Sequence, residues 1–169
     1  MKRVSLKPLE VSDAGEVYEL CRGTFREEYH ITEERILESL FEDPDFSAEE
    51  SKKIVDEKNG RMIGYIGVKV SHNEQLYPAS AWISIFAVKK EEQGKGYGTM
   101  VLNQVCQSLH KNGINKIYVG QDFNNFFSGI PDPDEGKEIF FKKNGFTLNR
   151  DRHFDLEADI TDNRLIDSF

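Results

Sequence analysis

A short run of glycines has the residue types and the spacing to bind the phosphate groups of a ligand. Residues 93 to 98 read Gln-Gly-Lys-Gly-Tyr-Gly and lie between an apolar, strand-like segment and an amphipathic helix. Glycine lets the backbone approach an anion without a Cβ in the way, and the first turn of a helix offers unpaired N–H groups and the positive end of the helix dipole. We therefore expect this junction to bind phosphate.

The spacing excludes two common phosphate-binding motifs. A P-loop has a glycine five residues before its Gly-Lys pair and a Ser or Thr directly after it, whereas this chain has Lys89 and Gly96 at those places. A dinucleotide fingerprint would need a third glycine where the chain has Thr99. The phosphate-bearing ligand is thus neither a P-loop nucleotide nor a dinucleotide bound in the usual way.

The run is similar to the Gln-x-x-Gly-x-Gly loop of the GNAT family, the Gcn5-related N-acetyltransferases. The resemblance extends to residues 80–88, which look like the fourth strand of the family, and to residues 140–146, which read Phe-Phe-Lys-Lys-Asn-Gly-Phe and resemble the signature at the end of its fourth helix. Two motifs occur in the right order, about fifty residues apart. On this resemblance the chain is identified as a member of the family.

The resemblance implies that acetyl-CoA is the cosubstrate and that no metal takes part. Backbone N–H groups of the glycine loop would hold the diphosphate, main-chain groups of the fourth strand would pair with the pantetheine arm like an added strand, and one N–H would polarise the thioester carbonyl. The coenzyme-binding residues expected on this basis are Phe86, Ala87, Val88, Gln93, Gly94, Lys95, Gly96, Tyr97, Gly98 and Thr99. The four histidines are scattered without metal-ligand spacing.

The resemblance also implies a fold, an α/β (α+β) domain over residues 1–169. It would have a mixed, twisted sheet of about seven strands flanked by about four helices, and the sheet would be split between strands 4 and 5. The residue pattern independently alternates strands and helices. It predicts strands over 4–9, 53–57, 62–70, 80–88, 114–119 and 154–160, and helices that start near residues 13, 32 and 97.

The pattern of the strand over 62–70 predicts which of its faces is buried. Asn59-Gly60 is a strong signal for a tight hairpin that joins this strand to the one before it. With a period of two, the set of residues 62, 64, 66, 68 and 70 is more apolar than the alternate set, which ends in Lys69. We expect the first set on the core side.

The acceptor site is less defined. Tyr118 and Asp122, at the end of the fifth strand, are placed to bind an acceptor, as are Phe126 and Phe127 in the apolar segment 120–134. That segment is either a lid over the acceptor pocket or a hydrophobic plug or dimer contact. The acceptor itself would be a primary amine of a small molecule or of a peptide.

Neither catalytic acid nor catalytic base is evident. Many relatives have a tyrosine proton donor where this chain has Phe141, and histone-type members have a glutamate base where it has Trp82. Catalysis would then depend on positioning, with a thiolate that leaves unassisted. The alternatives are a coenzyme-sensing or partner-binding module with little turnover, and a protein that acetylates its own partner subunit.

Composition limits the partners and the compartment. The net charge of -8 disfavours nucleic acid, which binds through Lys and Arg, and it favours a cationic amine. No stretch approaches the roughly 20 apolar residues of a membrane span. The two cysteines, Cys21 and Cys106, lack metal or redox spacing and are interpreted as free thiols of a reducing compartment. We expect a cytoplasmic protein that binds no membrane and is a monomer or a homodimer.

Overall fold

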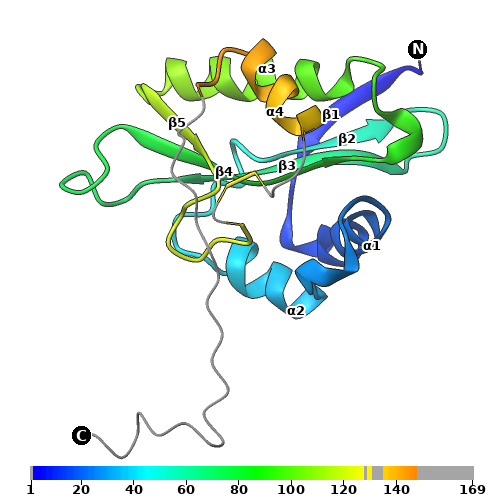
Figure 1. The fold of residues 1–169 in the computed structure, drawn as a ribbon, viewed down its shortest axis with the longest axis horizontal. Helices are drawn as coiled ribbons and strands as arrows, with labels where there is room; N and C mark the ends of the chain where they lie inside the picture. Colours follow the sequence, from blue (N-terminus) through cyan, green and yellow to red (C-terminus); the bar gives the residue numbers. More distant parts are fainter. Residues whose placement is uncertain (1, 128, 131–134, 148–169) are drawn as a thin grey trace, which may run out of the picture.

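One five-stranded mixed sheet organises the protein (Figure 1). The computed structural model describes residues 2–127, 129–130 and 135–147. In these residues the strand order is β1-β2-β3-β4-β5, antiparallel up to β4, and β5 is parallel to β4. The strands are Val4–Pro8, Lys52–Asp56, Met62–Val70, Ser80–Val88 and Lys116–Val119. The expectation of about seven strands is wrong for this part of the chain, and the strand predicted over 154–160 lies outside it.

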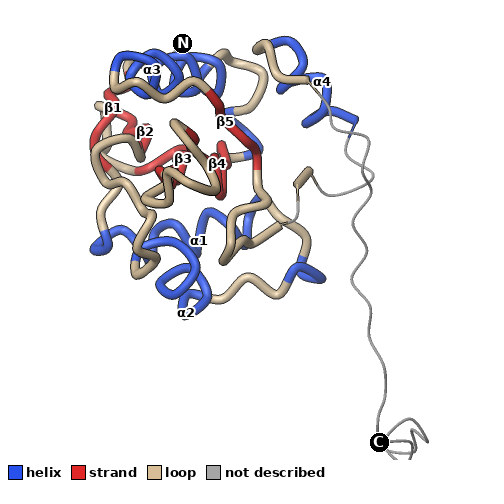
Figure 2. Tube along the Cα trace, turned by 90° about the vertical axis from the view of Figure 1, so that its left-hand side faces the viewer, coloured by secondary structure: helices blue, strands red, loops and turns tan. Residues whose placement is uncertain are grey.

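Helices cover both faces of the sheet (Figure 2). On one face lie α1 (Ala14–Thr24) and α2 (Glu33–Ile36), which continues as a π-helical turn over Leu37–Phe41. On the other lie α3 (Tyr97–Lys111) and α4 (Glu135–Lys143). Three 3-10 turns connect these elements, at Val11–Asp13, Glu27–Tyr29 and Lys90–Glu92. Thr32 caps α2 as predicted, since its Oγ1 accepts a hydrogen bond of 3.1 Å from the N–H of Arg35.

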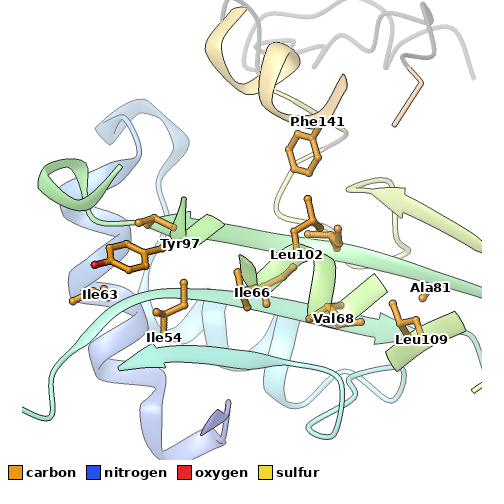
Figure 3. Packing of buried hydrophobic residues seen from close by; sticks show 13 residues of the cluster. Ile54, Ile63, Ile66, Val68, Ala81, Tyr97, Leu102, Leu109 and Phe141 are labelled. Atoms are coloured by element: carbon orange, nitrogen blue, oxygen red, sulfur yellow. The ribbon is translucent and has the colours of Figure 1, made fainter. Parts of the chain in front are cut away.

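The two helical layers bury two separate apolar clusters. The cluster beneath α3 is shown in Figure 3, where Phe141 approaches from α4. The second cluster packs α1 and α2 against the opposite face of the sheet. As a result β3 is buried on both faces: Ile66 and Val68 belong to the first cluster and Tyr65 to the second. The prediction that only one face of this strand meets the core is wrong, because a sheet with helices on both sides has no solvated face.

Two register shifts alter the alternation that the sequence suggests. The first lies in the pairing of β2 with β3, between Ile54 and Val55, and the second lies in the pairing of β3 with β4. In the second, Gly67 pairs with Ile85 and Val68 with Ile83, so Ser84 is an additional residue in β4. Such a bulge bends the strand and increases its twist.

The sheet opens beyond this bulge. β4 and β5 pair only from Ser80 to Ile83, and the last hydrogen bond runs from the N–H of Gly120 to the carbonyl of Ile83, at 2.9 Å. β4 continues to Val88, so its second half has no β5 residue beside it. The divergence falls at the place where the split was expected.

Candidate functional site

The glycine loop forms an open turn at the N-terminus of α3. Gly94 and Gly96 have φ angles of 73° and 85°, and no atom lies within 4 Å of a Cβ built at either position. Gly96 is the N-cap, and its carbonyl accepts the first helical bond, from Met100. The N–H groups of Tyr97, Gly98 and Thr99 therefore have no partner within the helix. Positive φ angles, empty space and unused donors together suit an anion.

A buried carboxylate supports this loop from below. The Glu92 side chain is only 5% exposed and lies 2.5 Å from Nζ of Lys2 and 2.9 Å from Nζ of Lys95. These two cations, Lys2 first, hold the pKa of Glu92 below its ordinary value. The ammonium of Lys95 also donates to the carbonyl of Glu91, at 2.6 Å. The ammonium of Lys95 thus contacts the residues below the loop, and its backbone N–H is the group that a ligand in the loop would contact.

The loop is joined to the open edge of β4. The Gln93 side-chain amide donates to the carbonyl of Val88, at 2.9 Å. The N–H of Lys89 donates to the carbonyl of Ile63 in β3. Main-chain groups of an antiparallel strand point to the same neighbour at every second residue, so those of Ala87 also face β3. Those of Phe86 and Val88 face the split. Of the three β4 residues predicted to bind the coenzyme, Phe86 and Val88 thus turn main-chain groups toward the split and Ala87 turns them toward β3, and the binding itself stays a prediction.

A small cavity occupies the split. Its volume is about 50 Å³, and it passes between the two helical layers. Residues of β4, of the segment after β5, of α4 and of the segment after α1 line it, among them Ser84, Phe86, Gly120, Phe127, Phe141 and Phe25. Lys137 of α4 lies 5.3 Å from the ring centroid of Phe25, so the two layers meet at this cavity.

A larger hollow of about 360 Å³ lies elsewhere, near the C-terminal ends of β3 and α3. Asp45, Glu50, His72 and Asn112 are among its lining residues. It contains neither the glycine loop nor the open strand edge. The smaller cavity is the candidate site. Of the two hollows in the described residues, it is the one that lies beside the free strand edge that leads to the glycine loop.

In the apolar segment after β5, Phe126 and Phe127 pack against α1, α2 and the turns that follow α1. Phe126 is 5% exposed, and its carbonyl accepts from the guanidinium of Arg35 at 3.2 Å. The Phe127 ring lies 5.3 Å from that of Phe25 and 5.2 Å from that of Tyr29, and it lines the cavity. The two phenylalanines predicted as acceptor residues therefore occupy different places, Phe126 in the core and Phe127 at the cavity.

Tyr118 and Asp122 also differ in their surroundings. Tyr118 is 38% exposed, and its ring is stacked on Trp82, away from the cavity lining. Asp122 is 4% exposed. Its Oδ1 lies 2.5 Å from Nζ of Lys69, and its Oδ2 accepts from the hydroxyl of Ser84 at 2.9 Å. Asp122 is not among the residues that line the cavity, whereas its partner Ser84 is, and a direct contact of Asp122 with the acceptor stays a prediction.

The positions at which relatives have catalytic groups hold packed aromatic rings. Phe141 is 6% exposed, lines the cavity and contacts the rings of Phe86, Phe140 and Phe146. Trp82 is 2% exposed. Neither side chain can act as a general acid or a general base.

Lys69 and Ser84 are not among the site residues that the sequence predicts. A lysine inside the apolar run of β3 was the available signal, because a buried ammonium requires carboxylate partners. The bulge that places Ser84 had no signal in the sequence.

Burial suppresses the reactivity of both thiols. Cys21 lies 2.9 Å from the hydroxyl of Tyr65, and burial raises the pKa of the Cys21 thiol to about 11. Burial also raises the pKa of Cys106. Since the thiolate is the nucleophile, burial disfavours the reactive form of both residues.

The described part of the chain contains no group of three or more His, Cys, Asp and Glu side chains arranged to hold a metal ion. Its helices are all too short or too polar to span a membrane.

Known proteins share this architecture. A family model, Acetyltransferase (GNAT) family, matches residues 14–128. No curated protein sequence matches the chain. Among solved structures, a GCN5-related glucosamine N-acetyltransferase region of a fungal multi-domain GH3 beta-N-acetylglucosaminidase superposes with a TM-score of 0.77 at 20% identity over 89% of this chain. The chain spans only 18% of the length of that protein.

Two other neighbours are matched over most of their length. The ribosomal-protein-S18-alanine N-acetyltransferase from Escherichia coli has a TM-score of 0.67 at 14% identity, with 86% of this chain and 78% of that chain covered. AAC(6')-Iy, in complex with the bisubstrate analog CoA-S-monomethyl-acetylneamine, has a TM-score of 0.66 at 10% identity, with 93% and 99% covered. At such identities the likeness shows the fold alone.

Proposed function

Because the chain belongs to the acetyltransferase (GNAT) family, we propose that it transfers an acetyl group from acetyl-CoA to a primary amine of a small molecule or of a peptide. One observation carries the proposal: the open edge of β4 leads, through the single 3-10 turn Lys90–Glu92, into the glycine turn at the start of α3. A ligand with an extended amide-bearing arm and a diphosphate needs these two features in this order.

The residues present fit such a cosubstrate. Backbone N–H groups of residues 94–99 would bind the diphosphate, where Gly94 and Gly96 leave room for it. Main-chain groups of Phe86 and Val88 would pair with the two amides of the pantetheine arm. The thioester would then lie at the cavity in the split, between β4 and Phe127. A preorganised N–H of β4 would stabilise the oxyanion that forms when the amine attacks.

The class of acceptor is proposed from the residues that line the cavity and from the net charge of the protein. The cavity wall toward α1 is aromatic, with Phe25 and Phe127, and the protein has a net charge of -8. An alkylammonium is attracted by the overall charge of the protein, and its carbon chain can pack on the Phe127 ring, since the ammonium of Lys137 already lies over the Phe25 ring. AAC(6')-Iy was solved with an analog that joins CoA to an acetylated aminoglycoside, and the Escherichia coli neighbour acts on an alanine of a ribosomal protein. Both small and peptide amines therefore belong in a substrate panel.

A second candidate function is supported by Phe141 and Trp82. With aromatic rings where relatives have a donor and a base, the domain would bind acetyl-CoA as a sensor and turn it over little. A single experiment separates the two. Calorimetry would measure acetyl-CoA binding, and a thiol-release assay would follow turnover with polyamines, aminoglycosides, amino acids and peptides. Amine-dependent thiol release supports the enzyme. Binding without release supports the sensor, and an absence of binding contradicts both.

A further inference from the structure

A buried cluster with unbalanced charge lies behind the cavity. Nζ of Lys69 lies 2.5 Å from Oδ1 of Asp122 and 3.0 Å from Oδ2 of Asp43, and it donates to the carbonyl of Asn124 at 3.2 Å. The side chains of Lys69, Asp122 and Asp43 are only 1%, 3% and 8% exposed. Two carboxylates thus share one ammonium, and the cluster has a net charge of −1. The four carboxylate oxygens thus exceed what one ammonium can neutralise, and Asp122 keeps Oδ2 for a partner other than Lys69.

Ser84 connects the cluster to the split. Its hydroxyl donates to Oδ2 of Asp122 at 2.9 Å, and Ser84 lines the cavity. The bulge makes Ser84 the additional residue of β4, at the point where β5 leaves. Among the described residues, Lys69 of β3 is paired with Asp122 and with Asp43 after the π-helical turn, and Lys137 of α4 lines the same cavity as Ser84. Ser84 therefore belongs both to the cavity lining and to the hydrogen-bonded cluster.

We infer that Ser84 and Asp122 form the path by which the acceptor ammonium loses its proton. The inference rests on the proposed function. The ammonium gives a proton to Oγ of Ser84, and Ser84 passes its own proton to Oδ2 of Asp122. The freed lone pair of nitrogen forms the bond to the thioester carbon, and the C–S bond breaks with its electron pair on sulfur. A second N–H proton leaves the nitrogen as the amide forms and is taken by the departing thiolate. Asp122 later returns its proton to solvent through Ser84.

This assignment supplies the base that position 82 lacks. The proton donor that position 141 lacks is not needed, because the thiolate takes its proton from the acceptor nitrogen. In this scheme Ser84 touches the acceptor, whereas Asp122 acts through Ser84. Lys69 and Asp43 position Asp122 and set the charge of the cluster. The side chains come from positions 43, 69, 84 and 122, so only the fold brings them together.

The test compares two acceptors of similar size and different basicity. Ethylamine is protonated at pH 7, whereas 2,2,2-trifluoroethylamine is neutral there because its fluorines withdraw electrons. For Ser84→Ala we expect kcat/KM with ethylamine to fall about 100-fold, within the usual range for loss of general-base catalysis. The value for trifluoroethylamine should fall less than about threefold on the same principle, since no proton has to leave before attack. The loss with ethylamine should shrink as the pH rises toward the pKa of the amine.

Matched variants guard against a purely structural effect. Ser39→Ala is the control, because Ser39 is also a buried serine and bonds to Asn124 of the same segment at 3.4 Å, away from the cavity lining. Its kinetics should equal those of the wild type. Asp122→Asn should repeat the pattern of Ser84→Ala, with acetyl-CoA affinity unchanged.

Equal losses for both amines in Ser84→Ala would overturn the inference and leave the proposed function intact. A wild-type protein that releases no thiol with any amine would overturn the proposed function and this inference with it. If Asp122→Asn fails to fold, Ser84→Ala alone decides, because it removes a single oxygen.

Discussion

Two glycines at opposite ends of α3 provide a matched test of the coenzyme loop. Gly96, at the N-terminus, has φ 85°, and Gly113, beyond the C-terminus, has φ 84°. A Cβ added to either glycine would have no atom within 4 Å. Alanine at either position therefore meets the same backbone strain and no clash. The two variants differ in their place, because Gly96 lies in the proposed diphosphate site and Gly113 does not.

The cost in stability follows from the backbone. A left-handed conformation costs an alanine about 1–2 kcal/mol, and the smaller conformational freedom of the unfolded chain offsets about 0.4–1 kcal/mol of it. We expect both variants to lose about 1 kcal/mol of the free energy of unfolding, which lowers Tm by about 2–4 °C for a domain of this size. Differential scanning calorimetry would measure this loss, which should be the same for Gly96→Ala and Gly113→Ala.

The two variants should differ in coenzyme binding. A Cβ at Gly96 enters the space assigned to the diphosphate and displaces at least one charge-assisted hydrogen bond, worth about 1.5–3 kcal/mol. The Kd for CoA should rise about 10- to 100-fold in Gly96→Ala, since 1.4 kcal/mol corresponds to a factor of ten. It should stay within about twofold of wild type in Gly113→Ala by the same conversion. Isothermal titration calorimetry decides. Unchanged affinity in Gly96→Ala, or an equal loss in both variants, would refute the assignment of this turn to the diphosphate.

Three further predictions concern stability and the acceptor. Glu92→Gln should lower stability to urea at pH 7, and the difference from wild type should vanish in acid. The lowered pKa of Glu92 contributes stability above its unfolded-state value of 4.5, and this contribution is lost as the pH falls through the folded-state pKa. An equal difference at pH 3 would contradict this. The pKa of Cys21 is raised from 9.0 to about 11, so Cys21 should react with iodoacetamide at pH 8 about 100-fold more slowly than a free cysteine, as mass spectrometry would show. The stability of the protein should also fall as the pH rises above about 9, because the thiol of the unfolded chain ionises before that of the folded chain. Phe126→Ala should cost about 3–5 kcal/mol of stability by chemical denaturation, as for a core phenylalanine, whereas Phe127→Ala should mainly raise the acceptor KM; a reversal of these two effects would exchange their roles.

The sequence predicted the parts of the fold that depend on local signals. The strand over Ser80–Val88 has the predicted bounds, and α3 begins directly after Gly96, because an apolar run and a glycine turn each determine the backbone within a few residues. The hairpin before β3 turns at Gly60, with φ 71°, although its connection is longer than the two residues of a tight hairpin.

The parts that could not be predicted depend on register and on distant contacts. A bulge shifts side chains from one face of a strand to the other by one residue, so Ser84 could not be assigned to a face from period-two alternation. The same alternation places Lys69 on the less buried face, yet Lys69 is 1% exposed because its ammonium is paired with Asp122. Asp122 is 53 residues away in the sequence, so this pairing could not be predicted from the local pattern. The candidate base is therefore evident only from the fold, which brings Lys69 of β3, Ser84 of β4 and Asp122 of the segment after β5 together.

The anchoring of Lys2 has a practical consequence for handling this protein. Its backbone N–H donates to the hydroxyl of Tyr97 at 2.8 Å, and its ammonium lies on Glu92 beneath the glycine turn. An affinity tag fused ahead of residue 2, or trimming of the first three residues by a protease, would disturb the support of the diphosphate turn. Preparations that differ only in which end is tagged should therefore be compared before weak CoA binding is ascribed to the native chain.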